Sequence, residues 1–149
     1  MFIVLNRLSK AQGTGRKGQG TRFKGQGTSL ITRLMSQELE DRFHAYGKRV
    51  RDFCLKLKWD IINIEYIRQL IRSSGSIGAN YIEASDDLGK MDEKMKIKIA
   101  RRESKETIHW LDLILTYGNK DLEKVRIELI DEAVQIRKIL SAILKKLGP

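Results

Sequence analysis

From residue 36 onward, apolar residues recur at the spacing of an α-helix in four successive segments. In the first segment the apolar residues lie three or four positions apart, so they share one side of a helix. This stripe consists of Leu39, Phe43, Tyr46, Val50, Phe53 and Leu57. Proline, which would interrupt a helix, occurs only at Pro149. The pattern therefore predicts an all-α protein.

Three short breaks separate the four segments. Ser36 and Asp121 are the expected caps of the first and last helices. We expect helices over about residues 36–57, 61–85, 91–116 and 121–147. Short loops between long helices make neighbours antiparallel, so residues 35–149 are predicted to form an up-down four-helix bundle. Each of the later helices also has an expected core stripe. In the helix over residues 61–85 it is Ile64, Ile67, Ile71, Ser74, Gly78 and Tyr81. In the helix over 91–116 it is Ile97, Ala100, Ser104, Ile108, Leu111 and Leu115, and in the helix over 121–147 it is Leu129, Ala133, Ile136, Leu140, Ile143 and Leu147.

Residues 1–34 differ sharply in composition from the rest of the chain. They contain seven Lys or Arg and no acid, against a net charge of +10 for all 149 residues. Lys10–Thr14 is repeated in similar form as Lys17–Thr21 and Lys24–Thr28. Such glycine-rich sequence buries too little apolar surface to offset its ordering entropy, so a disordered basic tail is expected.

Two interpretations of this tail remain open. It is either a basic arm that adds nonspecific nucleic-acid affinity, or repeat DNA translated upstream of a true start at Met35. The second is favoured, because a strict short repeat in which no apolar position recurs has no face to pack, and is typical of translated repeat DNA.

The second helical segment contains two interior glycines, Gly75 and Gly78. Each costs about 1 kcal/mol relative to alanine in a helix. Close approach of another backbone is the favoured explanation, and a phosphate-binding nest is the alternative.

The third segment carries a basic face in addition to its core stripe. Five cations follow one another at spacings that place them on one side of the helix: Lys94, Lys98, Arg101, Arg102 and Lys105. Such a face either binds phosphates or is simply solvated, and both interpretations fit the sequence.

The same segment carries a second apolar stripe, formed by Met95, Ile99, Trp110 and Leu113. A helix in a single small bundle needs only one buried face, so a second one predicts an interface with another subunit. The alternatives are a broad core face or an exposed tryptophan.

Two longer motifs resemble one known family. The first is Gln69–Ala84, and the second is Ile99–Glu106 followed by His109-Trp110-Leu111. They are similar to the signatures of the four-helix-bundle proteins first noted in intervening sequences of bacterial 23S ribosomal RNA genes. The accessory variability proteins of diversity-generating retroelements are similar as well. His109 departs from the pattern, which usually has tyrosine there.

The resemblance implies a homopentamer that binds RNA or DNA through a basic surface and has a reverse transcriptase among its candidate partners. It also marks a set of polar positions: Arg72, Ser76, Asn80, Glu83, Glu103 and Glu106. Arg72 is expected to pair with Glu103 or Glu106 across helices. Asn80 and Glu83 are expected to hold the turn between the second and third helices.

Catalytic and metal-dependent functions are not expected. His44 and His109 are the only histidines, and Cys54 is the only cysteine, expected to be buried as a small hydrophobe. Neither a metal site, a cofactor nor a catalytic residue is therefore predicted. No run approaches the roughly 20 apolar residues of a membrane span, so a cytoplasmic protein is expected.

Two functions remain. The first is an oligomeric scaffold that binds nucleic acid through the basic helix face, and the second is a protein–protein adaptor without nucleic-acid binding. The salt dependence of binding separates them, because contacts to phosphates weaken steeply with salt.

Overall fold

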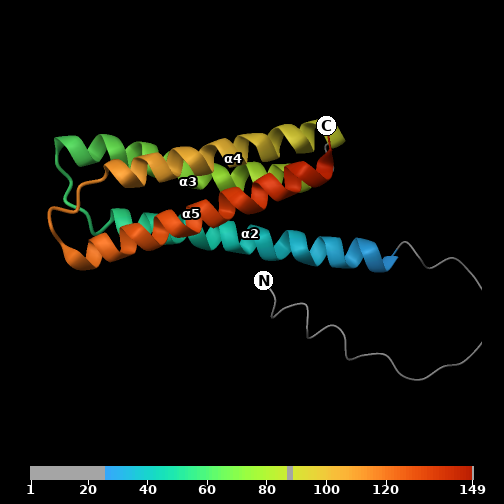
Figure 1. The fold of residues 1–149 in the computed structure, drawn as a ribbon, viewed down its shortest axis with the longest axis horizontal. Helices are drawn as coiled ribbons and strands as arrows, with labels where there is room; N and C mark the ends of the chain where they lie inside the picture. Colours follow the sequence, from blue (N-terminus) through green and yellow to red (C-terminus); the bar gives the residue numbers. More distant parts are fainter. Residues whose placement is uncertain (1–25, 87–88, 149) are drawn as a thin grey trace, which may run out of the picture. The chain divides into compact units, whose positions relative to one another are not determined.

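The computed structural model describes residues 26–86 and 89–148, with side chains described from Ser36 onward. Four helices make up nearly all of this part of the chain, and the described residues contain no strand. The helices are α2 (Gln26–Cys54), α3 (Ile61–Ser85), α4 (Lys90–Leu113) and α5 (Lys120–Leu147) (Figure 1). The predicted all-α, four-helix fold is confirmed.

Helix α2 begins at Gln26, well before the predicted start at Ser36. After Gly27 the sequence contains neither glycine nor proline up to Ser36, so nothing stops the helix from extending backward. Ser36 therefore lies inside α2 and does not cap it, and residues 26–34 are helical where a tail was expected. The tail predicted over residues 1–25 lies outside the described residues.

The chain from Thr32 onward forms one compact unit. Helix α4 contacts both α3 and α5. Helix α2 contacts α3 where the rings of Phe43 and Tyr81 form a T-shaped pair, with centroids 4.9 Å apart. It contacts α5 where Arg42 Nε donates to Glu132 Oε1 at 2.7 Å. The bundle therefore runs in the cyclic order α2, α3, α4, α5, so α2/α3 and α4/α5 are opposite sides.

The core is built mainly from the predicted stripes. Every residue of the first stripe from Phe43 to Leu57 is buried, and so are Leu129, Ala133, Ile136 and Leu140 of the last. Cys54 is buried as expected, and its burial raises the pKa of the thiol to about 12. The Tyr46 hydroxyl donates to the backbone oxygen of Leu129 at 3.1 Å, which ties α2 to α5 inside the core.

Two predicted core residues are wrong. Ile71 is 44% exposed, because the buried side of α3 is centred on Leu70 and Ile77 instead. Leu115 is 39% exposed, because α4 ends at Leu113 rather than Thr116. Ile114 leaves helical geometry with ψ of 134° and takes the buried place itself.

Side-chain caps set two of the helix starts. The Asp60 carboxylate accepts the backbone N–H groups of Ile62 and Asn63 at 3.1 and 3.0 Å, which starts α3. The Asn119 side chain accepts the N–H groups of Asp121 and Leu122, both at 3.1 Å, which starts α5. The prediction of Asp121 as the cap is therefore wrong, because α5 already begins at Lys120.

The two interior glycines of α3 have different surroundings. A Cβ at Gly78 would lie 3.8 Å from the Phe43 Cβ and 3.9 Å from its backbone carbon, so α2 does approach closely there. A Cβ at Gly75 would meet nothing within 4 Å. Helix α2 is thus in van der Waals contact with α3 at Gly78 and not at Gly75, but an alanine Cβ would fit at both positions. Close approach of another backbone therefore does not require glycine at either position.

Within the described residues, no helix has both the length and the apolar character that crossing a bilayer requires.

Candidate nucleic-acid interface

The basic side of α4 lies toward α5. Lys94 Nζ donates to the backbone oxygen of Gly148, just after the end of α5, at 2.6 Å. Lys98, Arg101 and Lys105 follow Lys94 at spacings of four, seven and eleven residues, so they lie on the same side of α4. All three side chains are exposed.

Helix α5 adds a fourth cation, Arg137, which was not predicted from the sequence. Arg126 Nη1 of α5 donates to the backbone oxygen of Leu111 in α4 at 3.1 Å, so this side of α5 faces α4. Arg137 follows Arg126 by eleven residues and therefore lies on the same side. Because the helices are antiparallel, Arg137 is level with Arg101, which precedes Leu111 by ten residues.

We call Lys98, Arg101, Lys105 and Arg137 the basic strip. Among the ion pairs of the described residues, none involves a member of this strip. Unpaired like charges repel one another, and an anion laid along the strip relieves that repulsion.

Arg102 stands apart from the other predicted phosphate contacts. Its guanidinium pairs with Glu103 at 3.4 Å and with Glu106 at 3.8 Å. The Glu103 side chain is only 7% exposed, so Arg102 partly neutralises a buried carboxylate. Arg102 therefore belongs to a charge cluster formed within α4, in which only Glu103 is buried.

The polar positions of the first motif have local roles. Arg72 is exposed, and the carboxylates that it was expected to pair with are bound by Arg102 instead. Asn80 Nδ2 donates to the backbone oxygen of Ser76 at 2.8 Å, within α3. Glu83 pairs with Lys96, which joins the end of α3 to the start of α4 beside the turn.

The second apolar stripe of α4 is divided in the structure. Trp110 is half-buried and stacks on Tyr66 of α3, with ring centroids 6.2 Å apart and planes 30° apart. Ile99 is also half-buried. Met95 and Leu113 remain exposed, at 55% and 38%. For Trp110 the structure thus favours the broad core face, while Met95 and Leu113 stay available to a partner.

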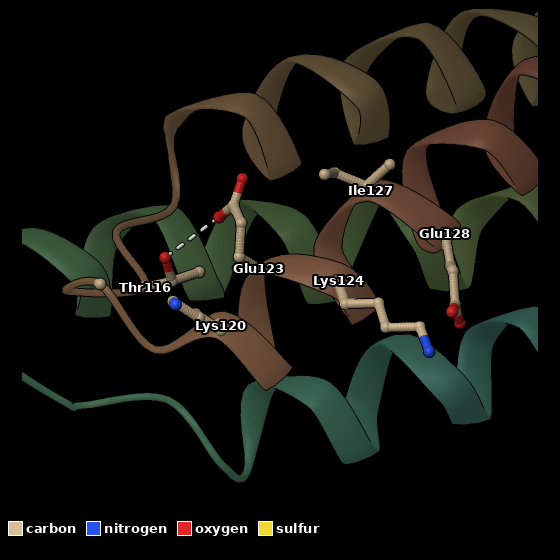
Figure 2. A pocket seen from close by; sticks show the side chains of 7 residues that line it. Thr116, Lys120, Glu123, Lys124, Ile127 and Glu128 are labelled. Carbon is tan, nitrogen blue, oxygen red and sulfur yellow. Dashed lines mark hydrogen bonds between the residues drawn. The ribbon is translucent and has the colours of Figure 1, made fainter.

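A shallow hollow of roughly 650 Å³ lies beside the loop between α4 and α5 (Figure 2). Two carboxylates line it, and one of them, Glu123, accepts a hydrogen bond from Thr116 at 3.1 Å and also pairs with Arg126. The hydrogen bonds from Arg126, with a smaller contribution from Thr116, lower the pKa of Glu123. A carboxylate engaged in this way is a structural link and a poor general base.

Metal-ligating residues do not cluster in the described part of the chain: no group of three or more His, Cys, Asp or Glu there is placed to hold an ion.

Comparisons with known proteins place this bundle among similar ones. The family model of the 23S rRNA-intervening sequence proteins matches residues 48–142. A crystal structure of a protein of unknown function from Bacteroides thetaiotaomicron, assigned to the S23 ribosomal protein family, is similar with a TM-score of 0.61 and 26% identity. The similarity covers 72% of this chain and 98% of that one. No curated protein matches the chain.

Proposed function

Because the chain belongs to the family of 23S rRNA-intervening sequence proteins, we propose that it is a non-catalytic, cytoplasmic scaffold that binds the phosphate backbone of nucleic acid. The observation that carries this proposal is the basic strip, in which two helices bring four cations together without acidic partners.

The form of the strip supports contact with the backbone rather than with the bases. From Lys98 to Lys105 it runs along α4 for about 10 Å, at the rise of an α-helix, and Arg137 widens it onto α5. None of its four members is aromatic, so it offers no platform on which unpaired bases would stack. We therefore expect sequence-independent binding to double-stranded nucleic acid.

The size of the salt effect follows from the number of cations. Four phosphate contacts give a slope of about −3.6 for log affinity against log salt concentration, or about a hundredfold weakening between 50 and 200 mM. Other basic parts of the chain add to the slope of the full protein, so the informative quantity is the change caused by removing members of the strip.

The experiment compares two double variants of the full chain by fluorescence anisotropy on a labelled 30-base-pair duplex. The test variant is Arg101→Gln with Arg137→Gln, which removes two charges from the strip. The control is Lys120→Gln with Lys124→Gln, which removes two exposed charges beside the α4–α5 loop. We expect the test variant to lower the slope by about 2 and the control to leave it nearly unchanged.

Equal slopes for the two variants would refute the assignment of the strip. A wild-type protein that binds neither duplex DNA nor duplex RNA at any salt concentration would instead favour the protein–protein adaptor.

We propose in addition that the protein self-associates through the exposed apolar side chains of α4. Met91, Met95 and Leu113 are 79%, 55% and 38% exposed, and their burial against another copy is favourable. Light scattering of Met95→Ser with Leu113→Ser should give a lower mass than the wild type. An unchanged mass, whether of a monomer or an oligomer, would contradict the proposal.

A further inference from the structure

A groove of roughly 420 Å³ runs between α2 and α3, on the side of the bundle opposite α4/α5. Its floor includes Gly47 of α2 and Gly75 and Gly78 of α3. A Cβ at Gly47 or Gly75 would meet nothing within 4 Å, so packing within the chain does not require glycine at either position. Glycine weakens a helix relative to alanine, so these positions lower helix stability and leave the groove deeper.

The groove is apolar along its length. Ile71 and Ile82 line it and are 44% and 46% exposed. A second hollow of roughly 340 Å³ shares Ile71 and continues the groove past Ile64 to Trp59, which is 56% exposed. Together the two hollows follow α3 from Ile82 back to Ile64, a length of about 27 Å at the rise of an α-helix. This length suits a helix of about 18 residues.

The rims of the groove are mainly basic. Lys48 and Arg51 line it from α2, and Arg68 lines its continuation from α3. Lys48 takes part in none of the ion pairs of the described residues, whereas Arg51 pairs with Asp52 and Arg68 pairs with Glu65. Both of these pairs are solvent-exposed and therefore weak, so the carboxylates of an occupant can replace Asp52 and Glu65. The carboxylate Glu40 lies at one end, where it accepts a hydrogen bond from Ser85 at 2.8 Å. An occupant with an apolar face and acidic flanks would therefore match both the floor and the rims.

We propose that this groove docks an amphipathic helix of a partner protein, with small and aliphatic residues on its buried face and Asp or Glu on its flanks. Residues 1–25 are a poor occupant, because they contain no acid to pair with the rims. Helix α4 of a second copy is also poor, because it carries more cations than acids. The proposal is independent of the nucleic-acid interface, which lies across the bundle.

A designed peptide provides the probe. It has about 18 residues, with Leu and Ala at helical spacing on one face, Glu at the remaining positions, and a fluorescent label. Its control has Lys in place of every Glu. We expect the full-length protein to bind the Glu peptide at least tenfold more tightly than the Lys peptide at low salt.

Variants of the protein locate the site. Gly75→Leu fills the groove and should weaken binding of the Glu peptide at least tenfold, while Ala142→Leu adds the same side chain at an exposed position of α5 and should not change it. Ile71→Ser with Ile82→Ser should also lose binding; both side chains are partly exposed, so the fold is retained. Circular dichroism checks the helix content of each variant.

Three results would overturn the proposal: no binding of the Glu peptide, equal binding of the two peptides, or unchanged binding to both groove variants. A fourth would be a lower oligomer mass for Gly75→Leu than for Ala142→Leu, because a second copy would then occupy the groove.

Discussion

Asn63 links the two loops at one end of the bundle, and its removal should be among the most destabilising single changes. The side chain is fully buried at the start of α3. Its Nδ2 donates to the backbone oxygens of Lys58 and Leu115, both at 3.0 Å. Its Oδ1 accepts the backbone N–H of Leu115, also at 3.0 Å. One amide thus satisfies three backbone groups in the segments before α3 and after α4.

The magnitude follows from those three bonds. Each contributes about 1 kcal/mol net, and a buried backbone group left without a partner costs about 1–3 kcal/mol. Asn63→Ala should therefore lower the free energy of unfolding by about 3–5 kcal/mol. At about 3 °C per kcal/mol for a domain of this size, the melting temperature should fall by about 10 °C.

The matched control is Asn80→Ala, because Asn80 lies in the same helix but only donates to Ser76 within it. That variant should stay within about 0.5 kcal/mol of the wild type. Urea unfolding followed by circular dichroism measures both. If Asn63→Ala lowers the free energy of unfolding by less than about 1 kcal/mol, or by no more than Asn80→Ala does, then Asn63 does not hold the two loops together.

Three further predictions concern single side chains. Burial raises the pKa of the Cys54 thiol to about 12. At pH 8 the folded protein should therefore react with a disulfide reagent at least about a hundredfold more slowly than the urea-unfolded chain. Comparable rates would show that Cys54 is accessible. Gly75→Ala adds a methyl group that meets nothing within 4 Å, so it should raise stability in urea by about 0.5–1 kcal/mol, and a loss would mean that α3 needs glycine there. Hydrogen bonds, mainly from Arg126, lower the pKa of Glu123 in the folded protein. The ionised Glu123 side chain therefore stabilises the fold above the unfolded pKa of about 4.3, and this stabilisation is lost as the pH falls through the lower pKa of the folded state. Glu123→Gln should therefore lower the melting temperature slightly at pH 7 and not at pH 3, whereas an equal loss at both values would point to an uncharged cause.

The sequence predicted the helices and most of the core because both depend on local spacing. The stripe from Phe43 to Leu57 repeats every three or four residues, and a helix of that register buries one side whatever it packs against. The helix ends were less predictable. Helix α4 ends at Leu113 rather than Thr116. The backbone groups of Leu115 hydrogen-bond instead to the side chain of Asn63, 52 positions away in the sequence. A tertiary contact decides that boundary, and local propensity does not reveal it.

The candidate interface was predictable only in part, for the same reason. The cations of α4 share a helix face, and the sequence shows this directly. Arg137 is a single basic residue in the sequence of α5, and only the antiparallel register between Leu111 and Arg126 brings it level with Arg101. Trp110 is a different case: its spacing placed it on a second apolar face, and in the structure it is half-buried and stacks on Tyr66 of α3 in the same chain.

The cyclic order of the helices makes the two proposed surfaces independent. The basic strip belongs to α4 and α5, the groove belongs to α2 and α3, and no helix contributes to both. Simultaneous binding is therefore expected, and the protein would bring an acidic helix close to a nucleic acid without letting the two polyanions compete for the same cations. Saturating duplex should leave the affinity for the Glu peptide within about twofold, since packed helix axes are about 8–10 Å apart and the two surfaces lie on opposite sides of the bundle, whereas the Debye length is about 8 Å at 0.15 M salt. Direct competition at that salt concentration would mean that the peptide binds the basic strip, and that the groove between α2 and α3 is not its site.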